Sequence, residues 1–124
     1  RYRSYHGATM GAMALTGDRR RLHWEPAVMP GVVHFLDPFR YRSVFFKGRG
    51  LVPDSVYTQA YLDNLEEVIR FEGPQKIAAI LLEPITGTNG IIIPPEGYMK
   101  GVREICDHHN ILMIMHMFQA LFFF

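Results

Sequence analysis

The sequence predicts an α/β fold in which a mostly parallel sheet is packed with helices. Two continuous apolar runs have the length and composition of strands: residues 76–84 "KIAAILLEP", which suit a strand buried on both faces, and 111–115 "ILMIM", which suit a buried strand. A helical pattern lies between them, and strand, helix and strand in this order form a βαβ unit. The two strands should therefore lie parallel in one sheet and be joined by a right-handed crossover; whether they are neighbours stays open.

Composition places limits on the partners. The chain has 124 residues, of which 48% are hydrophobic, enough for one modest core. Thirteen Lys and Arg residues against twelve Asp and Glu residues leave a formal charge of +1, which makes no electrostatic case for nucleic acid. The apolar runs are far shorter than the ~20 residues needed to cross a bilayer. We therefore expect neither nucleic acid nor a membrane among the partners.

The single cysteine, Cys106, excludes an internal disulfide and a Cys-based zinc site. It lies in a helical pattern and fits a small buried hydrophobe in a reducing compartment, so we predict a cytoplasmic protein. The six histidines show no metal-ligand spacing, and no metal is expected. The chain starts without Met at "RYRSYHG", and we expect both ends to lie inside a longer protein.

The remaining elements follow from local patterns. Small residues at 8–16, closing on Gly17, predict a short helix, and "GVVHFLD" at 31–37 predicts a short strand. Residues 38–56 lack a sustained period and predict a long loop. The run Arg19–Arg21 is interpreted as a solvated surface loop in preference to a ligand site.

Two helices are predicted from apolar stripes. The first has Asp54 or Ser55 as its cap and Gly73-Pro74 as its stop, and the start of the second is marked by Pro94 and Pro95. Their stripes are Tyr61, Leu62, Leu65, Val68 and Ile69, and Tyr98, Met99, Val102, Ile105 and Cys106. The segment "ITGTNG" between them is predicted to form a turn and not a phosphate-binding loop, because it lacks the GK[ST] ending of such a loop.

Candidate site residues come from strand ends. Ligands of parallel sheets bind beyond the carboxyl ends of the strands, where Glu83 and His116 lie. For Glu83 the alternative is a carboxylate paired with loop N–H groups or with an arginine, which this pattern alone slightly favours. "SYHGAT" places Tyr5 and His6 just before Gly7; the Tyr5 ring either covers a planar ligand or is an ordinary core tyrosine.

Taken together, several segments resemble a family. "SYHGAT", the small-residue helix, "LTGD" and "LLEPITGTNGIIIPPEGYMKGVREICDHHNILMI" are similar to the central part of class III aminotransferases, fold type I enzymes that use pyridoxal 5'-phosphate. "EPITGTNGIIIPP" and "LTGD" are more similar to the branch that transfers an amino group from ω-amino donors, such as β-alanine or taurine, to pyruvate. The resemblance covers residues 1 to about 114 and a minority of a full family member.

The resemblance implies a site. Residues 1–124 would be part of one large, cofactor-binding domain of a homodimeric enzyme, with an amino donor and a keto acid as small-molecule partners. Tyr5 resembles the residue that stacks on the cofactor ring, His6 and Gly7 complete that motif, and Glu83 resembles the glutamate near the ring hydroxyl. The family's Schiff-base lysine lies beyond the end of this chain. We therefore assign no catalytic residue, and expect the chain to be inactive alone.

Residues 115–124 depart from the family. His116 stands where the resemblance implies an aspartate that pairs with the pyridine nitrogen, and Met117 where it implies a glutamate. A neutral imidazole supplies no anionic partner, which weakens the ring as an electron sink. We favour a truncated chain with an altered end over a tuned site. The alternative function is a non-catalytic remnant that associates with other chains; a nucleotide-binding domain is disfavoured because both Gly-rich fingerprints are absent.

Overall fold

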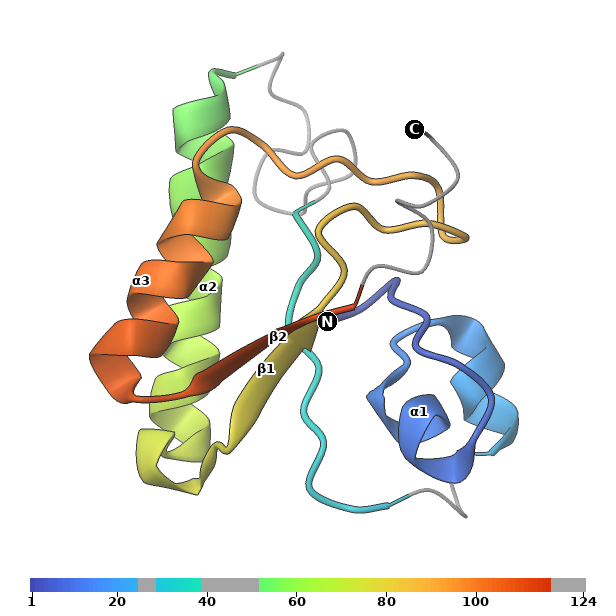
Figure 1. Ribbon diagram of the computed structural model, residues 1–124. Helices are drawn as coiled ribbons and strands as arrows, with labels where there is room; N and C mark the ends of the chain where they lie inside the picture. The colour runs from blue at the N-terminus through green and yellow to red at the C-terminus, as the bar shows by residue number, and fades with distance from the viewer. Residues whose placement is uncertain (25–28, 39–51, 117–124) are drawn as a thin grey trace.

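The computed structural model describes residues 1–24, 29–38 and 52–116. Most of the predicted loop at 38–56 and the departing tail from 117 onward lie outside the described residues. Helices α2 and α3 run side by side along one face of a small sheet (Figure 1). The N-terminal segment with α1 lies beyond the carboxyl ends of the two strands (Figure 1). This arrangement brings the start of the chain to the strand ends.

The predicted parallel βαβ unit is confirmed. Strands β1 (Ala79–Leu82) and β2 (Leu112–Met115) are parallel neighbours, with Ala79 level with Leu112 and Leu82 level with Met115. The predictions that the first strand is buried on both faces and that the second is buried are wrong for the described residues. Only alternate β1 side chains are buried, and Leu112 of β2 is 68% exposed. The reason is that α2 and α3 cover one face only (Figure 1).

Helix α2 (Asp54–Glu72) confirms the first predicted stripe. Its buried side chains follow at intervals of four residues: Tyr57, Tyr61, Leu65 and Ile69. The helix ends at Gly73, whose φ of 85° favours glycine and whose N–H donates to the Ile69 carbonyl. The predicted cap is wrong. Pro53 takes the cap position, and the Asp54 carboxylate instead accepts the Glu96 N–H at 3.1 Å.

Helix α3 (Tyr98–His109) confirms the second stripe but begins three residues after Pro95. Its buried residues are Tyr98, Gly101, Val102, Ile105 and Cys106. All of these except Gly101 pack with the α2 stripe and with β1 in one hydrophobic core, which also includes Phe35 and Ile111. The core therefore joins α2, α3 and β1, and it supports the strand ends from one side.

The N-terminal predictions had mixed outcomes. Helix α1 (Met10–Leu15) is confirmed and is capped by the Thr9 side chain, which accepts the Ala12 N–H. The predicted strand at 31–37 is wrong, because those residues form no strand. Instead the Phe35 carbonyl accepts the Tyr2 N–H at 2.9 Å, and the Leu36 N–H donates to the Asn64 side chain.

Gly101 provides a test of the α2–α3 contact. A Cβ added there would lie 2.2 Å from Leu62 Cδ1, so Gly101→Ala forces the Leu62 side chain to move. We expect a loss of about 1–2 kcal/mol in unfolding free energy, because overpacking outweighs the gain in helix propensity of about 1 kcal/mol. Chemical denaturation measures it. In a Leu62→Ala background the same change should cost nothing or stabilise; an equal cost in both backgrounds would exclude this contact as the cause.

Candidate functional site

Glu83 and His116 lie side by side, because the two strands are parallel neighbours. Each follows its strand directly, and the His116 N–H continues the ladder by donating to the Leu82 carbonyl at 2.9 Å. Parallel strands in this register deliver their next residues to the same edge of the sheet. The two residues therefore form the floor of the candidate site.

The Glu83 carboxylate is held at this edge by two backbone N–H groups. It is 5% exposed; Oε1 accepts the Tyr5 N–H at 2.9 Å, and Oε2 accepts the Gly87 N–H at 3.1 Å. The alternative weighed from the sequence, pairing with loop N–H groups, is thus present. Each carboxylate oxygen still has a second lone pair. Glu83 consequently holds the "SYH" segment against the turn after β1, and its predicted role beside a cofactor stays a prediction.

Arg1 is a site residue that sequence reasoning missed. Its guanidinium is buried, and Nη2 donates both to the Glu83 carbonyl and to Thr86 Oγ1, the latter at 2.7 Å. The contact joins residues more than 80 positions apart, so no local pattern signals it. Arg1 fixes the backbone from which the Glu83 side chain projects.

The His6 ring packs edge-on against the His116 ring of this floor. Their ring centroids are 5.4 Å apart at an interplanar angle of 68°. Both ring nitrogens of His6 are buried and make no hydrogen bond within the described residues. Burial, reinforced by the neighbouring amino terminus of the chain and by the Arg1 guanidinium, lowers the pKa of His6 to about 4. His6 is therefore neutral at pH 7 and presents unsatisfied polar atoms to a ligand.

This pKa gives a prediction for stability. An unfolded histidine has a pKa near ~6.5, so between that pH and about 4 the unfolded chain binds a proton that folded His6 does not. The free energy of unfolding should fall as pH falls through this window. Above it, the contribution of His6 should not change with pH. Comparing chemical denaturation of the parent protein and His6→Gln measures the effect. A pH slope that is unchanged in the variant would contradict it, since His34, with its own lowered pKa, remains in both proteins.

Tyr5 is covered on one face by an arginine. The Arg20 guanidinium carbon lies 4.5 Å from the centroid of the Tyr5 ring. Arg20 belongs to a short 3-10 helix (Arg19–His23), so the predicted loop is wrong there, whereas the predicted surface position holds because the Arg20 side chain is 52% exposed. A ring that already bears a planar guanidinium on one face can take a planar ligand on the other.

Gly7 completes the predicted motif. Its φ of 121° lies in the region that side chains rarely adopt, and an added Cβ would approach Ala12 Cβ to 3.3 Å. Glycine at this position lets the chain turn from the Tyr5–His6 segment into α1. Thus the five predicted site residues occupy one region. The contacts join Tyr5 to Glu83 and His6 to His116, and Gly7 follows directly in sequence.

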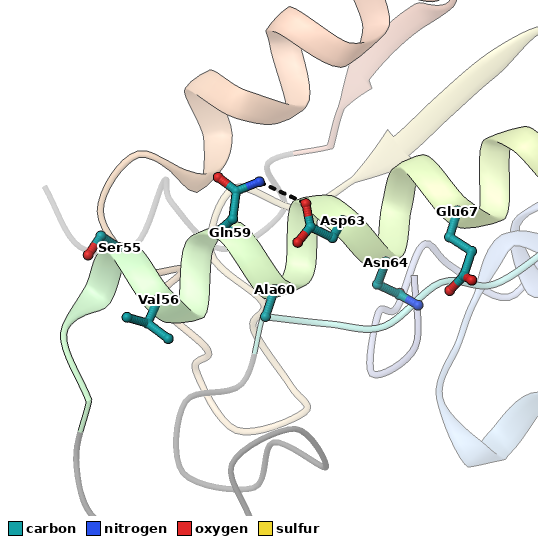
Figure 2. Close-up of a pocket in the computed structure, with 7 residues that line it drawn as sticks. All are labelled: Ser55, Val56, Gln59, Ala60, Asp63, Asn64 and Glu67. Atoms are coloured by element: carbon teal, nitrogen blue, oxygen red, sulfur yellow. Dashed lines mark hydrogen bonds between the residues drawn. The ribbon is translucent and has the colours of Figure 1, made fainter.

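A separate surface hollow of about 800 Å³ lies along α2. Figure 2 shows its lining residues, which include Gln59, Asp63, Asn64 and Glu67, with a hydrogen bond between Gln59 and Asp63. None of the predicted site residues lines it.

In the described ranges no group of three His, Cys, Asp or Glu side chains is placed to hold a metal ion. The described helices are also too short or too polar to span a membrane.

Comparison with known proteins gives a consistent result. The family model described as aminotransferase class-III matches residues 2–119. A taurine–pyruvate aminotransferase of Bilophila wadsworthia is 39% identical over 116 residues, which is 93% of this chain and 24% of that protein. An omega-amino acid–pyruvate aminotransferase of Pseudomonas putida is 34% identical over 92% of this chain and 24% of its own length.

Solved structures agree. A taurine:2-oxoglutarate aminotransferase from Bifidobacterium kashiwanohense, in complex with PLP and glutamate, matches with a TM-score of 0.83 and 49% identity. The match covers 92% of this chain and 25% of that one. The fold is thus that of a piece of an α/β transaminase domain. The chain belongs to the class III aminotransferase family, whose cofactor is pyridoxal 5'-phosphate, and spans about a quarter of the length of the relatives described here.

Proposed function

We propose that the protein containing this chain is a transaminase that moves an amino group from an ω-amino donor to a keto acid such as pyruvate. The observation that carries the proposal is the convergence of Tyr5, His6, Glu83 and His116 at the carboxyl ends of two parallel strands in a class III chain. Relatives named for taurine–pyruvate and omega-amino acid–pyruvate transfer support the donor class. Residues 1–124 form part of its large domain.

The described residues fit pyridoxal phosphate in most respects. Tyr5 supplies an aromatic face, Glu83 is fixed at the strand end, and the unsatisfied nitrogens of His6 are available to a polar ligand. When bound, the cofactor supplies an electron sink for chemistry at the amino carbon. In this proposal Tyr5 orients the ring and Glu83 holds its polar edge. Position 116 fits the cofactor less well, because an imidazole stands where an anionic partner of the pyridine nitrogen would be expected.

His116 therefore yields a direct prediction. His116→Asp should tighten binding of pyridoxal phosphate to the apoprotein about tenfold or more, because a carboxylate stabilises a protonated pyridine nitrogen through a charged hydrogen bond. A fluorescence titration measures the dissociation constant. His116→Asn is the matched control, since it changes size in the same way without adding charge. Equal affinities for the Asp and Asn variants would contradict the charge argument.

Activity is tested on the product of the longest reading frame that contains this chain. With pyridoxal phosphate, β-alanine or taurine, and pyruvate, the proposal predicts alanine formation in equal amount to the aldehyde left by the donor. Absence of alanine from a folded protein that has bound the cofactor would overturn the proposal. Sequencing the gene through codon 116 accompanies the assay, because it establishes which residue the protein carries there.

His116 also favours a second candidate, a non-catalytic remnant that acts only by associating with other chains. If the gene encodes an aspartate at position 116, followed by a lysine in the family's motif, the remnant candidate is excluded.

For either candidate we propose a homodimeric parent protein in the cytoplasm, where a reduced, buried Cys106 is stable. Size-exclusion chromatography with light scattering tests the dimer.

A further inference from the structure

Arg20 is held in place on three sides. Its Nε lies 2.7 Å from Asp18 Oδ1, and Nη2 donates to Asp18 Oδ2 at 3.3 Å and to Thr88 Oγ1 at 3.2 Å. The Tyr5 ring lies beneath the guanidinium. The hydrogen bond from Arg20 lowers the pKa of Asp18, so the carboxylate stays ionised. The guanidinium is therefore preorganised beside the ring that we propose supports the cofactor.

One edge of this guanidinium remains available to a ligand. The contacts of Arg20 in the described residues use Nε and Nη2, and its side chain is 52% exposed. A fixed arginine with an open edge is suited to bind carboxylate or sulfonate oxygens. The ion pair with Asp18 does not cancel the local field, because residues 1–24 carry five arginines and one aspartate, a net charge of +4.

From this geometry we propose that Arg20 binds the anionic end of the substrate, the carboxylate or sulfonate that an ω-amino donor carries opposite its amine. This inference rests on the proposed function and adds a specificity-determining residue to it. Arg20 and the cofactor would share Tyr5 as a common support. A short donor with its amine at the cofactor then places its anionic group toward the open guanidinium edge. Donors without an anionic group gain nothing from Arg20.

The test compares Arg20→Met and Arg20→Lys with Arg19→Met in the product of the longest reading frame. Arg19 is an exposed neighbour on the same short helix, so its variant removes the same charge from the same surface. The donor half of the reaction is followed without keto acid, using β-alanine as the anionic donor and propylamine as the uncharged one. Calorimetry on the apoprotein measures binding of propionate and ethanesulfonate, which requires no turnover.

Arg20→Met should raise the β-alanine concentration needed for half-maximal rate about tenfold to a hundredfold more than it raises the value for propylamine. It should weaken propionate and ethanesulfonate binding by a similar factor, Arg20→Lys should recover part of the loss, and Arg19→Met should resemble the parent. Equal loss for both donors would overturn the inference and leave Arg20 as a support for Tyr5. Anion binding that depends on Arg20 without any turnover would uphold the subsite and count against the proposed function.

Discussion

Replacing Glu83 with alanine is expected to cost about 2–6 kcal/mol of unfolding free energy. The change leaves the N–H groups of Tyr5 and Gly87 without their carboxylate acceptor at a buried position, and each unsatisfied buried donor costs about 1–3 kcal/mol. Chemical denaturation of the parent and variant proteins gives the difference. The variant should also lose the fixed position of Tyr5, because Glu83 is what holds the Tyr5 backbone to the sheet.

Two further variants separate this explanation from a general effect of losing charge. Glu67 is an exposed carboxylate on α2, and Glu67→Ala should change stability by less than about 0.5 kcal/mol. Glu83→Gln keeps one acceptor but turns an amide N–H₂ toward a backbone donor, so it should recover only part of the loss. Stability in Glu83→Gln equal to that of the parent would contradict the two-acceptor role of Glu83.

Gly17→Ala is expected to destabilise the protein by more than about 3 kcal/mol. An added Cβ would lie 2.1 Å from the Arg1 carbonyl oxygen and 2.6 Å from Tyr2 Cα, both backbone atoms that cannot rotate away. Overpacking costs about 1–3 kcal/mol where side chains can yield, and more where they cannot. The Gly17 N–H also donates to Ser4 at 3.1 Å, so the N-terminal segment would have to move with its site residues.

Gly11 in α1 offers a matched control for this change. A Cβ there meets nothing within 4 Å. Gly11→Ala should therefore leave the free energy of unfolding unchanged or raise it by up to about 1 kcal/mol, because alanine has the higher helix propensity. Thermal and chemical denaturation of both variants provides the comparison. A Gly17→Ala protein as stable as the Gly11→Ala protein would show that the close approach of residues 1–2 and 17 is absent in solution.

The sequence predicted the elements whose signals are local. The α2 and α3 stripes depend on helical periodicity within one segment, and the two strands depend on continuous apolar runs; the structure has these elements, with the strands parallel as predicted. The strand prediction for residues 31–37 was wrong because β-branched composition indicates only that a segment can adopt an extended backbone. Strand formation also needs a partner backbone, and Phe35 and Leu36 instead bond to Tyr2 and the Asn64 side chain.

The same distinction between local signals and tertiary contacts explains which site residues could be predicted from the sequence. Glu83 and His116 were predictable because a parallel sheet delivers strand ends to one edge. Arg1 and Arg20 were not, since their contacts with Glu83, Thr86 and Tyr5 arise from tertiary packing of distant segments. A charge run such as Arg19–Arg21 indicates exposure on average. It does not distinguish the one arginine that stacks on an aromatic ring.

The most direct test of the central claim, a pyridoxal phosphate site at the ends of β1 and β2, is non-covalent binding of 4'-deoxypyridoxine 5'-phosphate. This analogue cannot form a Schiff base, so it reports the ring site without labelling surface lysines. We predict saturable binding that weakens at least about tenfold in Tyr5→Ala and is unchanged in Phe71→Ala, which removes an exposed α2 aromatic. Absence of binding, or equal binding by both variants, would contradict the assignment.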